Sequence, residues 1–214
     1  MTNHLDEHLS FWQNVVQLKY DGMLKLGGGI YQHRFRANGS VIKVNHCRAT
    51  IVDGARAGYR TLLIASDDIL SPRYLNDPDG NAVILVPRRH LGIEDIGVEL
   101  HGKKLEPSRV FLKHILMCKK DSGDNYRCGS SFIFLRENNE CFPSHVWQGL
   151  GYRYVTVRVH DVEEEHARAL ERGASEIQPP TVMGMRAKIS FIGDPYGNAF
   201  ELSQRADLAM QKST

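Results

Sequence analysis

A short turn sequence occurs twice in this chain, and each copy comes directly before an apolar run. Residues 77–81 read Asp-Pro-Asp-Gly-Asn, and residues 194–198 read Asp-Pro-Tyr-Gly-Asn. Proline fixes the φ angle at the second position of a turn, and glycine allows the positive φ that closes it. The runs at 82–86 and 199–202 are typical of β-strands. A turn and a strand repeated in this way predict an internal duplication.

A second repeat supports the duplication. Residues 58–69 align without gaps on residues 151–162, and both segments begin with Gly-Tyr-Arg and continue as an apolar strand with an acidic end. The second copy leads into a helix predicted over 162–172, with three glutamates in its first turn and Gly173 after its end. In the first copy, too few residues separate the Gly-Tyr-Arg start from the Asp-Pro turn to hold such a helix. We therefore expect the first copy to lack a helix and a strand.

Composition excludes several classes of function. The chain has 214 residues, enough for one large domain or two small ones with a substantial core. A net charge of +2 without long Lys/Arg runs argues against nucleic-acid binding. The apolar stretches are too short to span a membrane, and the polar, acidic residues 1–7 do not resemble a signal peptide. We expect a cytoplasmic protein without nucleic-acid or membrane partners.

The cysteines are expected to be reduced thiols. Disulfides are rare in cytoplasmic proteins, and zinc sites usually contain closely spaced cysteine pairs. No Cys-x-x-Cys spacing occurs among Cys47, Cys118, Cys128 and Cys141. A zinc site or disulfides are the alternative.

Hydrophobic periodicity predicts the order of the remaining elements. Helical spacing covers 9–26 and is followed by three glycines, and a hairpin is expected over 30–45 around a turn at 37–39. Other strands are expected at 59–65, 82–86, 93–100, 132–136, 152–159, 186–192 and 199–203, and other helices at 106–117 and 162–172. Strands alternating with single helices in this order indicate an α+β fold built from βαβββ units.

The chain resembles the vicinal oxygen chelate superfamily, which includes glyoxalase I, extradiol dioxygenases and bleomycin-resistance proteins. Residues 193–202 read Gly-Asp-Pro-Tyr-Gly-Asn-Ala-Phe-Glu-Leu, close to the turn and Glu-Leu strand of that superfamily, and the helix at 11–18 resembles its Phe-Tyr-x-x-Val-Leu-Gly-Leu helix. The resemblance implies tandem paired βαβββ modules in two domains, 1–90 and 91–206, followed by a tail at 207–214.

The first domain is expected to be trimmed. Besides its missing helix, only residues 1–4 precede the first predicted helix cap, too few for a strand of typical length. An open sheet edge is prone to pair with other chains. We therefore expect that edge to be covered by a second subunit or by the second domain, and we expect a homodimer.

The resemblance also implies where a metal would be bound, because superfamily ligands come from the first and last strands of each module. In the first domain these positions are Lys43, Thr61 and Ile84, which do not suit a divalent metal. In the second domain they are Asp95, Phe134, Tyr154 and Glu201, without a histidine. We expect no cofactor and no tightly held transition metal; a divalent ion, if bound, would be held by Asp95 and Glu201.

Glu201 is the leading candidate for chemistry. It lies on an apolar strand, where a carboxylate needs a metal, a proton or a hydrogen-bond partner. The alternative is that Glu201 pairs with an arginine or faces solvent. Carboxyl groups in an apolar pocket have raised pKa values and can act as general acid or base near neutrality. Asp95 and Tyr154 are the expected catalytic partners, and the expected substrate-binding residues are Phe134, His145, Trp147, Thr156 and Arg158.

The expected ligand is a small, partly apolar, oxygenated molecule. We expect an enzyme, a lyase, isomerase or ring-modifying enzyme, that acts by acid–base chemistry. A non-catalytic protein that sequesters a small molecule and a metal-dependent extradiol-type dioxygenase are the alternatives, because a fold alone does not decide among them.

Overall fold

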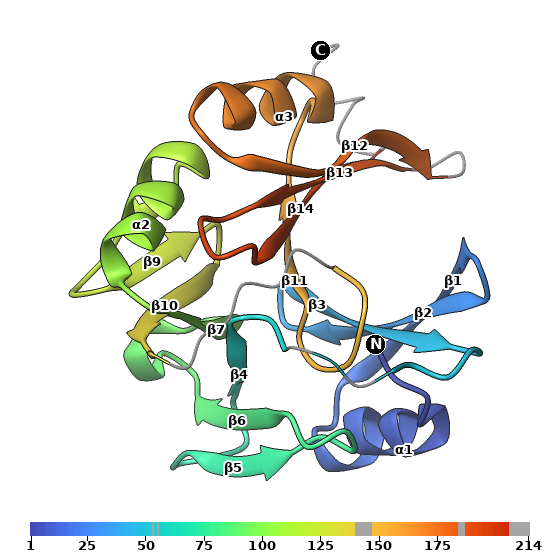
Figure 1. Ribbon diagram of the computed structural model, residues 1–214. Coiled ribbons are helices and arrows are strands. Elements are labelled where there is room, and N and C mark those ends of the chain that lie inside the picture. The colour runs from blue at the N-terminus through green and yellow to red at the C-terminus, as the bar shows by residue number, and fades with distance from the viewer. Residues whose placement is uncertain (53, 55, 140–146, 184–186, 206–214) are drawn as a thin grey trace, which may run out of the picture.

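The computed structural model describes residues 1–52, 54, 56–139, 147–183 and 187–205. Its strands form three sheets (Figure 1). The first has the order β1 (Lys19–Gly27), β2 (Ile30–Ala37), β3 (Ser40–Cys47). The second has the order β5 (Arg73–Asn76), β6 (Ala82–Pro87), β4 (Tyr59–Ser66), β7 (Ile96–Gly102), β10 (Ser131–Glu137), β9 (Asn125–Cys128), β8 (Lys119–Lys120). The third has the order β11 (Tyr154–Arg158), β14 (Ala199–Arg205), β13 (Ala187–Gly193), β12 (Ser175–Met183).

The helices are few and lie outside the sheets. They are α1 (Leu5–Ser10), the π-helical turn η1 (Phe11–Val15), the short 3₁₀ turn η2 (His90–Gly92), α2 (Leu105–Val110), the π-helical turn η3 (Phe111–Ile115) and α3 (Val162–Glu171). Figure 1 shows α3 against the sheet that contains β12, β13 and β14, and α1 at the opposite end of the molecule. The Asp161 carboxylate caps α3 by accepting a hydrogen bond from the backbone of Glu164, as the acidic start of this helix predicts.

The predicted βαβββ modules are confirmed. In each unit that has both strands, the first strand pairs in parallel with the last: β4 with β6, β7 with β10, and β11 with β14. The two repeated turns are equivalent, since each precedes the last strand of its unit and each aspartate accepts a hydrogen bond from the asparagine backbone four residues on, at 2.8 Å in both copies. The unit β4–β5–β6 lacks the helix and one strand of the unit β11–α3–β12–β13–β14, as expected.

The first strand of the N-terminal unit is reduced to one residue. Thr2 forms a single parallel bridge with His46 on β3, through hydrogen bonds from Thr2 N to Asn45 O at 2.9 Å and from Cys47 N to Thr2 O at 3.0 Å. The N-terminal unit is therefore trimmed at its first strand, as expected. Thr2 covers one end of the β3 edge, and the rest of that edge meets side chains of β11 from the second half of the same chain.

The prediction of a helix over 9–26 is wrong in its second half. The helix begins at Leu5 and ends after η1, where Gln17 takes a left-handed φ of 64°, and β1 then pairs antiparallel with β2. The same helix, π-helical turn and left-handed residue recur in α2 and η3, where Met117 has a φ of 54°. Met23, which fits the helical spacing of the sequence, lies on β1 and is 41% exposed.

Two main apolar clusters pack beneath the helices. One joins α1 and η1 to β2, β3, β4 and β6 and lies within residues 11–85. The other joins α2, η3 and α3 to β7, β10 and β14, mostly within residues 100–202. Each predicted domain thus contributes an apolar cluster. Because β4 and β7 pair along one sheet across residue 90, the division into two domains stays a proposal.

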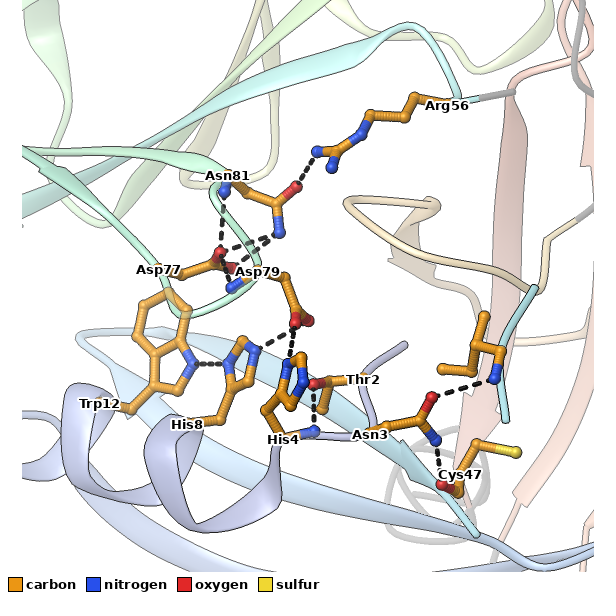
Figure 2. A network of polar contacts seen from close by, with 11 residues as sticks. Thr2, Asn3, His4, His8, Trp12, Cys47, Arg56, Asp77, Asp79 and Asn81 are labelled. Atoms are coloured by element: carbon orange, nitrogen blue, oxygen red, sulfur yellow. Dashed lines mark hydrogen bonds and ion pairs between the residues drawn. The ribbon is translucent and has the colours of Figure 1, made fainter. Parts of the chain in front are cut away.

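A polar network ties the N-terminal helix to the first repeated turn. Figure 2 shows the His8 ring between Trp12 and Asp79: the Trp12 Nε1 donates to His8 Nδ1 at 3.2 Å, and His8 Nε2 lies 3.0 Å from Asp79. His4 reaches the other oxygen of the same carboxylate at 2.8 Å. Because His8 Nδ1 accepts a hydrogen bond, its Nε2 carries the hydrogen that Asp79 accepts.

Replacing Asp79 with asparagine is expected to destabilise the protein by about 1–3 kcal/mol near pH 7, because one buried histidine loses a charged acceptor. Burial alone would raise the pKa of Asp79, but hydrogen bonds from His8 and His4 outweigh burial and lower that pKa. The stabilisation is therefore complete above the unfolded pKa of about 3.9 and is lost as the pH falls below it. Urea unfolding between pH 2 and 7 checks this; the Asp79→Asn profile should be flatter in acid, and the exposed loop variant Asp68→Asn should follow the wild type.

The remaining sequence-based expectations concern cysteines and membranes. Cys47, Cys118 and Cys128 are free, in agreement with the expectation of thiols, and Cys141 lies outside the described residues. Within the part of the chain that the structure describes, no helix is long and apolar enough to cross a membrane.

Candidate functional site

Two edge strands, β3 and β11, meet where the N-terminal unit lacks its first strand. Backbone pairing joins β3 only to β2 and β11 only to β14 among the named strands, so the two halves are held here by side chains. Arg34 lies opposite Lys43 in the β2–β3 register, and Thr156 lies opposite Glu201 in the β11–β14 register. Opposed residues project from the same face of a sheet, and these four residues face the interior between the two sheets.

Lys43 and Glu201 form the centre of this interior. The Lys43 Nζ donates to Glu201 Oε2 at 2.6 Å and to Thr156 Oγ1 at 2.7 Å, and Thr156 Oγ1 donates to the same Glu201 oxygen at 2.6 Å. The lysine and glutamate side chains are only 16% and 7% exposed. Burial lowers the pKa of Lys43, and the charge and hydrogen bond of Glu201 act in the opposite direction. The predicted partner for Glu201 is therefore present, but it is a lysine rather than an arginine.

Tyr154 stands beside this pair as a neutral hydrogen-bond donor. Its hydroxyl accepts hydrogen bonds from Asn45 Nδ2 at 3.1 Å and from Gln32 Nε2 at 3.5 Å, while Gln32 also donates to Asn45 Oδ1 at 3.0 Å. Burial, followed by the negative charge of Glu201, raises the pKa of Tyr154. Because the side-chain amides of Asn45 and Gln32 occupy both acceptor positions of the Tyr154 oxygen, its hydroxyl hydrogen is available to donate to an oxygen of a ligand.

An aromatic wall lines the other side of Tyr154. Trp147 stacks on Phe191 with ring centroids 4.9 Å apart, and Tyr154 meets Phe191 edge to face at 5.3 Å. The Lys43 Nζ lies 5.5 Å from the Tyr154 ring centroid. The site therefore combines charged and polar groups with a flat apolar surface, which suits a ligand that is part oxygenated and part apolar.

Asp95 does not join Glu201, contrary to the expectation from sequence. Strand β7 begins at Ile96, so Asp95 lies before it, and its Oδ1 accepts a hydrogen bond from the Gly39 backbone at 2.9 Å. Gly39 lies in the β2–β3 turn, four residues from Lys43 along an extended strand, a separation of about 13 Å. Asp95 therefore holds a turn at the far end of β3 and takes no part in the pair.

Phe134 lies in a different sheet from Glu201. It stacks on Phe132 within an apolar cluster on the inner face of the seven-stranded sheet, where Leu63 and partly buried Ile84 also pack. Thr61, on the same sheet, is buried. Of the other expected ligand contacts, Thr156 and Trp147 line the site, Arg158 is exposed on the same face of β11, and His145 lies outside the described residues.

Sequence reasoning missed the contribution of β2 and β3. The sequence places Lys43 only at a ligand position of the first domain that does not suit a metal, and it gives no role to Gln32, Arg34 or Asn45. Alternation along 30–36 and 40–45 could have shown these polar side chains on one face. Which sheet that face would meet is decided by contacts between distant parts of the chain, and no local pattern reports them.

The donor set at this position does not fit a divalent metal. The ammonium of Lys43 stands within 2.6 Å of the only carboxylate in the cluster, where a bound cation would otherwise sit, and Lys43 itself cannot act as a ligand while protonated. Across the described residues, no group of three His, Cys, Asp or Glu side chains is placed to hold a metal ion. Asp95 and Glu201, the expected ligands, lie apart.

Solved structures share this architecture. Glyoxalase I from Zea mays has 19% sequence identity and a TM-score of 0.76, with 98% of this chain and 92% of that chain covered. Its V278E mutant gives 18% identity, a TM-score of 0.77 and the same coverage. A putative dioxygenase from Bacillus subtilis subsp. subtilis str. 168 gives 13% identity and a TM-score of 0.65, with 96% and 83% covered. At these identities the likeness establishes the fold.

The sequence carries a family signature of its own. A search of curated proteins gave no match. Residues 100–202 match the model of the Glyoxalase/Bleomycin resistance protein/Dioxygenase superfamily, a region that contains Tyr154, Thr156 and Glu201. This match identifies residues 100–202 as a domain of the Glyoxalase/Bleomycin resistance protein/Dioxygenase superfamily, the vicinal oxygen chelate superfamily, and the paired βαβββ modules give the whole chain the same fold.

Proposed function

We propose that this protein is an enzyme that binds a small, partly apolar, oxygenated molecule between β3, β11 and β14 and acts on it by acid–base chemistry. The observation that carries the proposal is the buried contact between Lys43 and Glu201 at 2.6 Å, beside the hydroxyl of Tyr154. It brings a proton acceptor, a cation and a neutral donor to one interior face. A cytoplasmic location and a homodimer are parts of the proposal.

The chemistry that these groups support is proton transfer next to a carbonyl. Glu201 takes the proton from the carbon beside the carbonyl, that C–H bond breaks, and its electron pair moves into an enolate. The enolate oxygen accepts hydrogen bonds from the Lys43 ammonium and the Tyr154 hydroxyl, which stabilise the developing negative charge. Returning a proton to the same carbon from its other face, as the carbonyl re-forms, inverts that carbon and gives an isomerase. Re-forming the carbonyl while a leaving group departs with its bonding electrons from the next carbon along, so that a C=C bond forms, gives a lyase. Trp147 and Phe191 support the apolar part of the ligand.

One observation favours a non-catalytic binding protein as the second candidate. Glu201 Oε2 already accepts hydrogen bonds from both Lys43 and Thr156, so a ligand must compete with a satisfied pair before Glu201 can remove a proton. A protein that only sequesters its ligand would not need that exchange. The extradiol dioxygenase alternative needs a metal, and the donor set does not fit one.

The proposal is tested by incubating protein, purified in the presence of a chelator, with a panel of small carbonyl compounds in deuterated water. An acid–base enzyme incorporates deuterium or forms product, which mass spectrometry and NMR detect. A binding protein only raises its melting temperature with the ligand. Deuterium exchange or turnover that depends wholly on added metal would contradict the proposed chemistry.

Tyr154→Phe is expected to lower turnover by about tenfold, less than loss of the proton acceptor, because only one hydrogen bond to the developing oxyanion is removed. The ring and its contacts with Phe191 and Trp147 remain. Steady-state kinetics should show the loss mainly in kcat. An unchanged kcat would remove Tyr154 from the reaction.

A further inference from the structure

The interior that holds Lys43 and Glu201 carries more positive than negative charge. We define the arginine cluster as Arg34, Arg158 and Arg205. Arg34 lies directly opposite Lys43 on β2, while Arg158 and Arg205 lie on the same faces of β11 and β14 as Thr156 and Glu201. All three side chains therefore start from the sheet faces that border the interior already described.

The charges of the three arginines affect one another. Burial lowers the pKa of Arg34, the positive charges of Arg205 and Arg158 lower it further, and Asp21 and Glu201 oppose them. Effects of this kind require charges that are close and poorly screened. Arg34 is only 9% exposed, Arg205 is half-buried and Arg158 is exposed. The cluster thus runs from buried Arg34 to exposed Arg158 at the end of β11.

The carboxylates beside the cluster are already engaged. Glu201 is neutralised by Lys43 at 2.6 Å, and Asp21 binds Arg36 at 2.6 Å through its other oxygen. The Arg34 Nε lies 3.8 Å from Asp21, which is beyond hydrogen-bond length. Within the described residues, neither the terminal nitrogens of Arg34 nor any nitrogen of Arg158 has a hydrogen-bond acceptor. Arg205 has a further contact of its own, so Arg34 and Arg158 carry the argument.

A guanidinium that is largely buried and has no protein acceptor for its terminal nitrogens is suited to a planar oxyanion, which accepts two parallel hydrogen bonds from it. We propose that the arginine cluster binds an anionic group of the ligand, a carboxylate or a phosphate, next to the Lys43–Glu201 pair. This inference deepens the proposed function: the substrate is an anion whose charged group binds at Arg34 and Arg158 while its carbonyl end lies between Lys43 and Tyr154.

To distinguish a phosphate from a carboxylate ligand, the protein is titrated with inorganic phosphate and with malonate in low-chloride buffer at pH 7. Isothermal titration calorimetry measures the binding. We expect saturable binding of one equivalent of at least one probe. Arg34→Met should weaken it by about tenfold or more, because a charge-assisted hydrogen-bond pair is lost. Arg158→Met, which changes an exposed residue, should weaken it by about threefold. Arg168→Met, an equal charge change on the outer helix α3, should bind as the wild type does.

Arg34→Lys is a second variant in case Arg34→Met does not fold, since lysine keeps the charge and removes only the planar guanidinium. If Arg34→Lys binds the anion more weakly than the wild type, the result supports a bidentate contact. Wild-type protein that binds neither probe, or arginine variants that bind both probes as tightly as Arg168→Met, would overturn the inference.

The Glu201→Gln variant separates anion binding from the proposed chemistry. That variant should keep or tighten anion binding while losing turnover, so anion binding that survives in an unreactive protein shows that only the catalytic proposal has failed.

Discussion

A Glu201→Gln variant is expected to lose about 10²–10⁴-fold in turnover, the usual effect of removing a general acid–base group. Glutamine keeps the shape of the side chain and can still accept a hydrogen bond from Thr156, so the loss reports the missing proton acceptor. Steady-state kinetics with the best carbonyl substrate measure the effect. Glu99→Gln is the matched control, because Glu99 is also ion-paired, to Arg136 at 3.5 Å, but lies on β7 in the other sheet.

The stability of Glu201→Gln should depend on pH in a specific direction. The variant leaves Lys43 buried without its anion, and burial already lowers the pKa of Lys43. The destabilisation is then present below the folded-state pKa of Lys43 and disappears as the pH rises from it toward the unfolded value of about 10.4, where the lysine is neutral. A folded variant with wild-type turnover would remove Glu201 from the mechanism and leave the binding protein as the better candidate.

Lys43→Met is expected to destabilise the protein by about 3–5 kcal/mol at pH 7, because it leaves the Glu201 carboxylate buried without a counter-ion. Methionine keeps most of the apolar volume of lysine, so packing changes little. Urea unfolding followed by circular dichroism measures the change. Lys188→Met is the control, since Lys188 pairs with Glu163 in solvent-exposed positions, where an ion pair contributes little.

The double variant Lys43→Met/Glu201→Gln sharpens this test. Removing both charges of a buried pair often costs little, so most of the stability lost in Lys43→Met should return. Additive losses in the double variant would show that the two side chains act independently, and the site would then have to be reconsidered. Turnover should stay low in the double variant, since it lacks both the proton acceptor and the cation.

The elements predicted correctly from sequence are those with strong local chemistry. The two Asp-Pro turns owe their geometry to proline, glycine and an aspartate that accepts backbone hydrogen bonds. All three residues lie within a segment of five residues, so the turn can be predicted from local sequence. The helix over 162–172 has an aspartate cap, and α3 ends at Glu171. The wrong boundary near Gln17 has no such signal, because a left-handed glutamine is uncommon and the exposed apolar residues of β1 imitate a helical period.

The site was only partly predictable. Glu201, Tyr154 and Thr156 lie on strands whose alternation can be read from sequence, and the structure brings them together. Asp95 was misplaced because β7, which it precedes, joins the seven-stranded sheet, whereas Glu201 lies in the sheet of β11 and β14. Its carboxylate contacts Gly39 instead. The sequence identifies Lys43 as a strand residue but does not predict its neighbours, because the face that β3 meets is determined by residues more than a hundred positions away.

The distance between Lys43 and Glu201 along the chain, 158 residues, also has a consequence for folding order. Lys43 emerges early in synthesis and Glu201 near the end, so the lysine must stay hydrated until β14 is made. Closing so long a loop is slow and gains nothing until both strands are in place. The turn at 77–81 and the helix α1, by contrast, can join within the first half of the chain. The Lys43–Glu201 pair is therefore among the last contacts to form, and a nascent chain gains stable structure well before this pair is assembled.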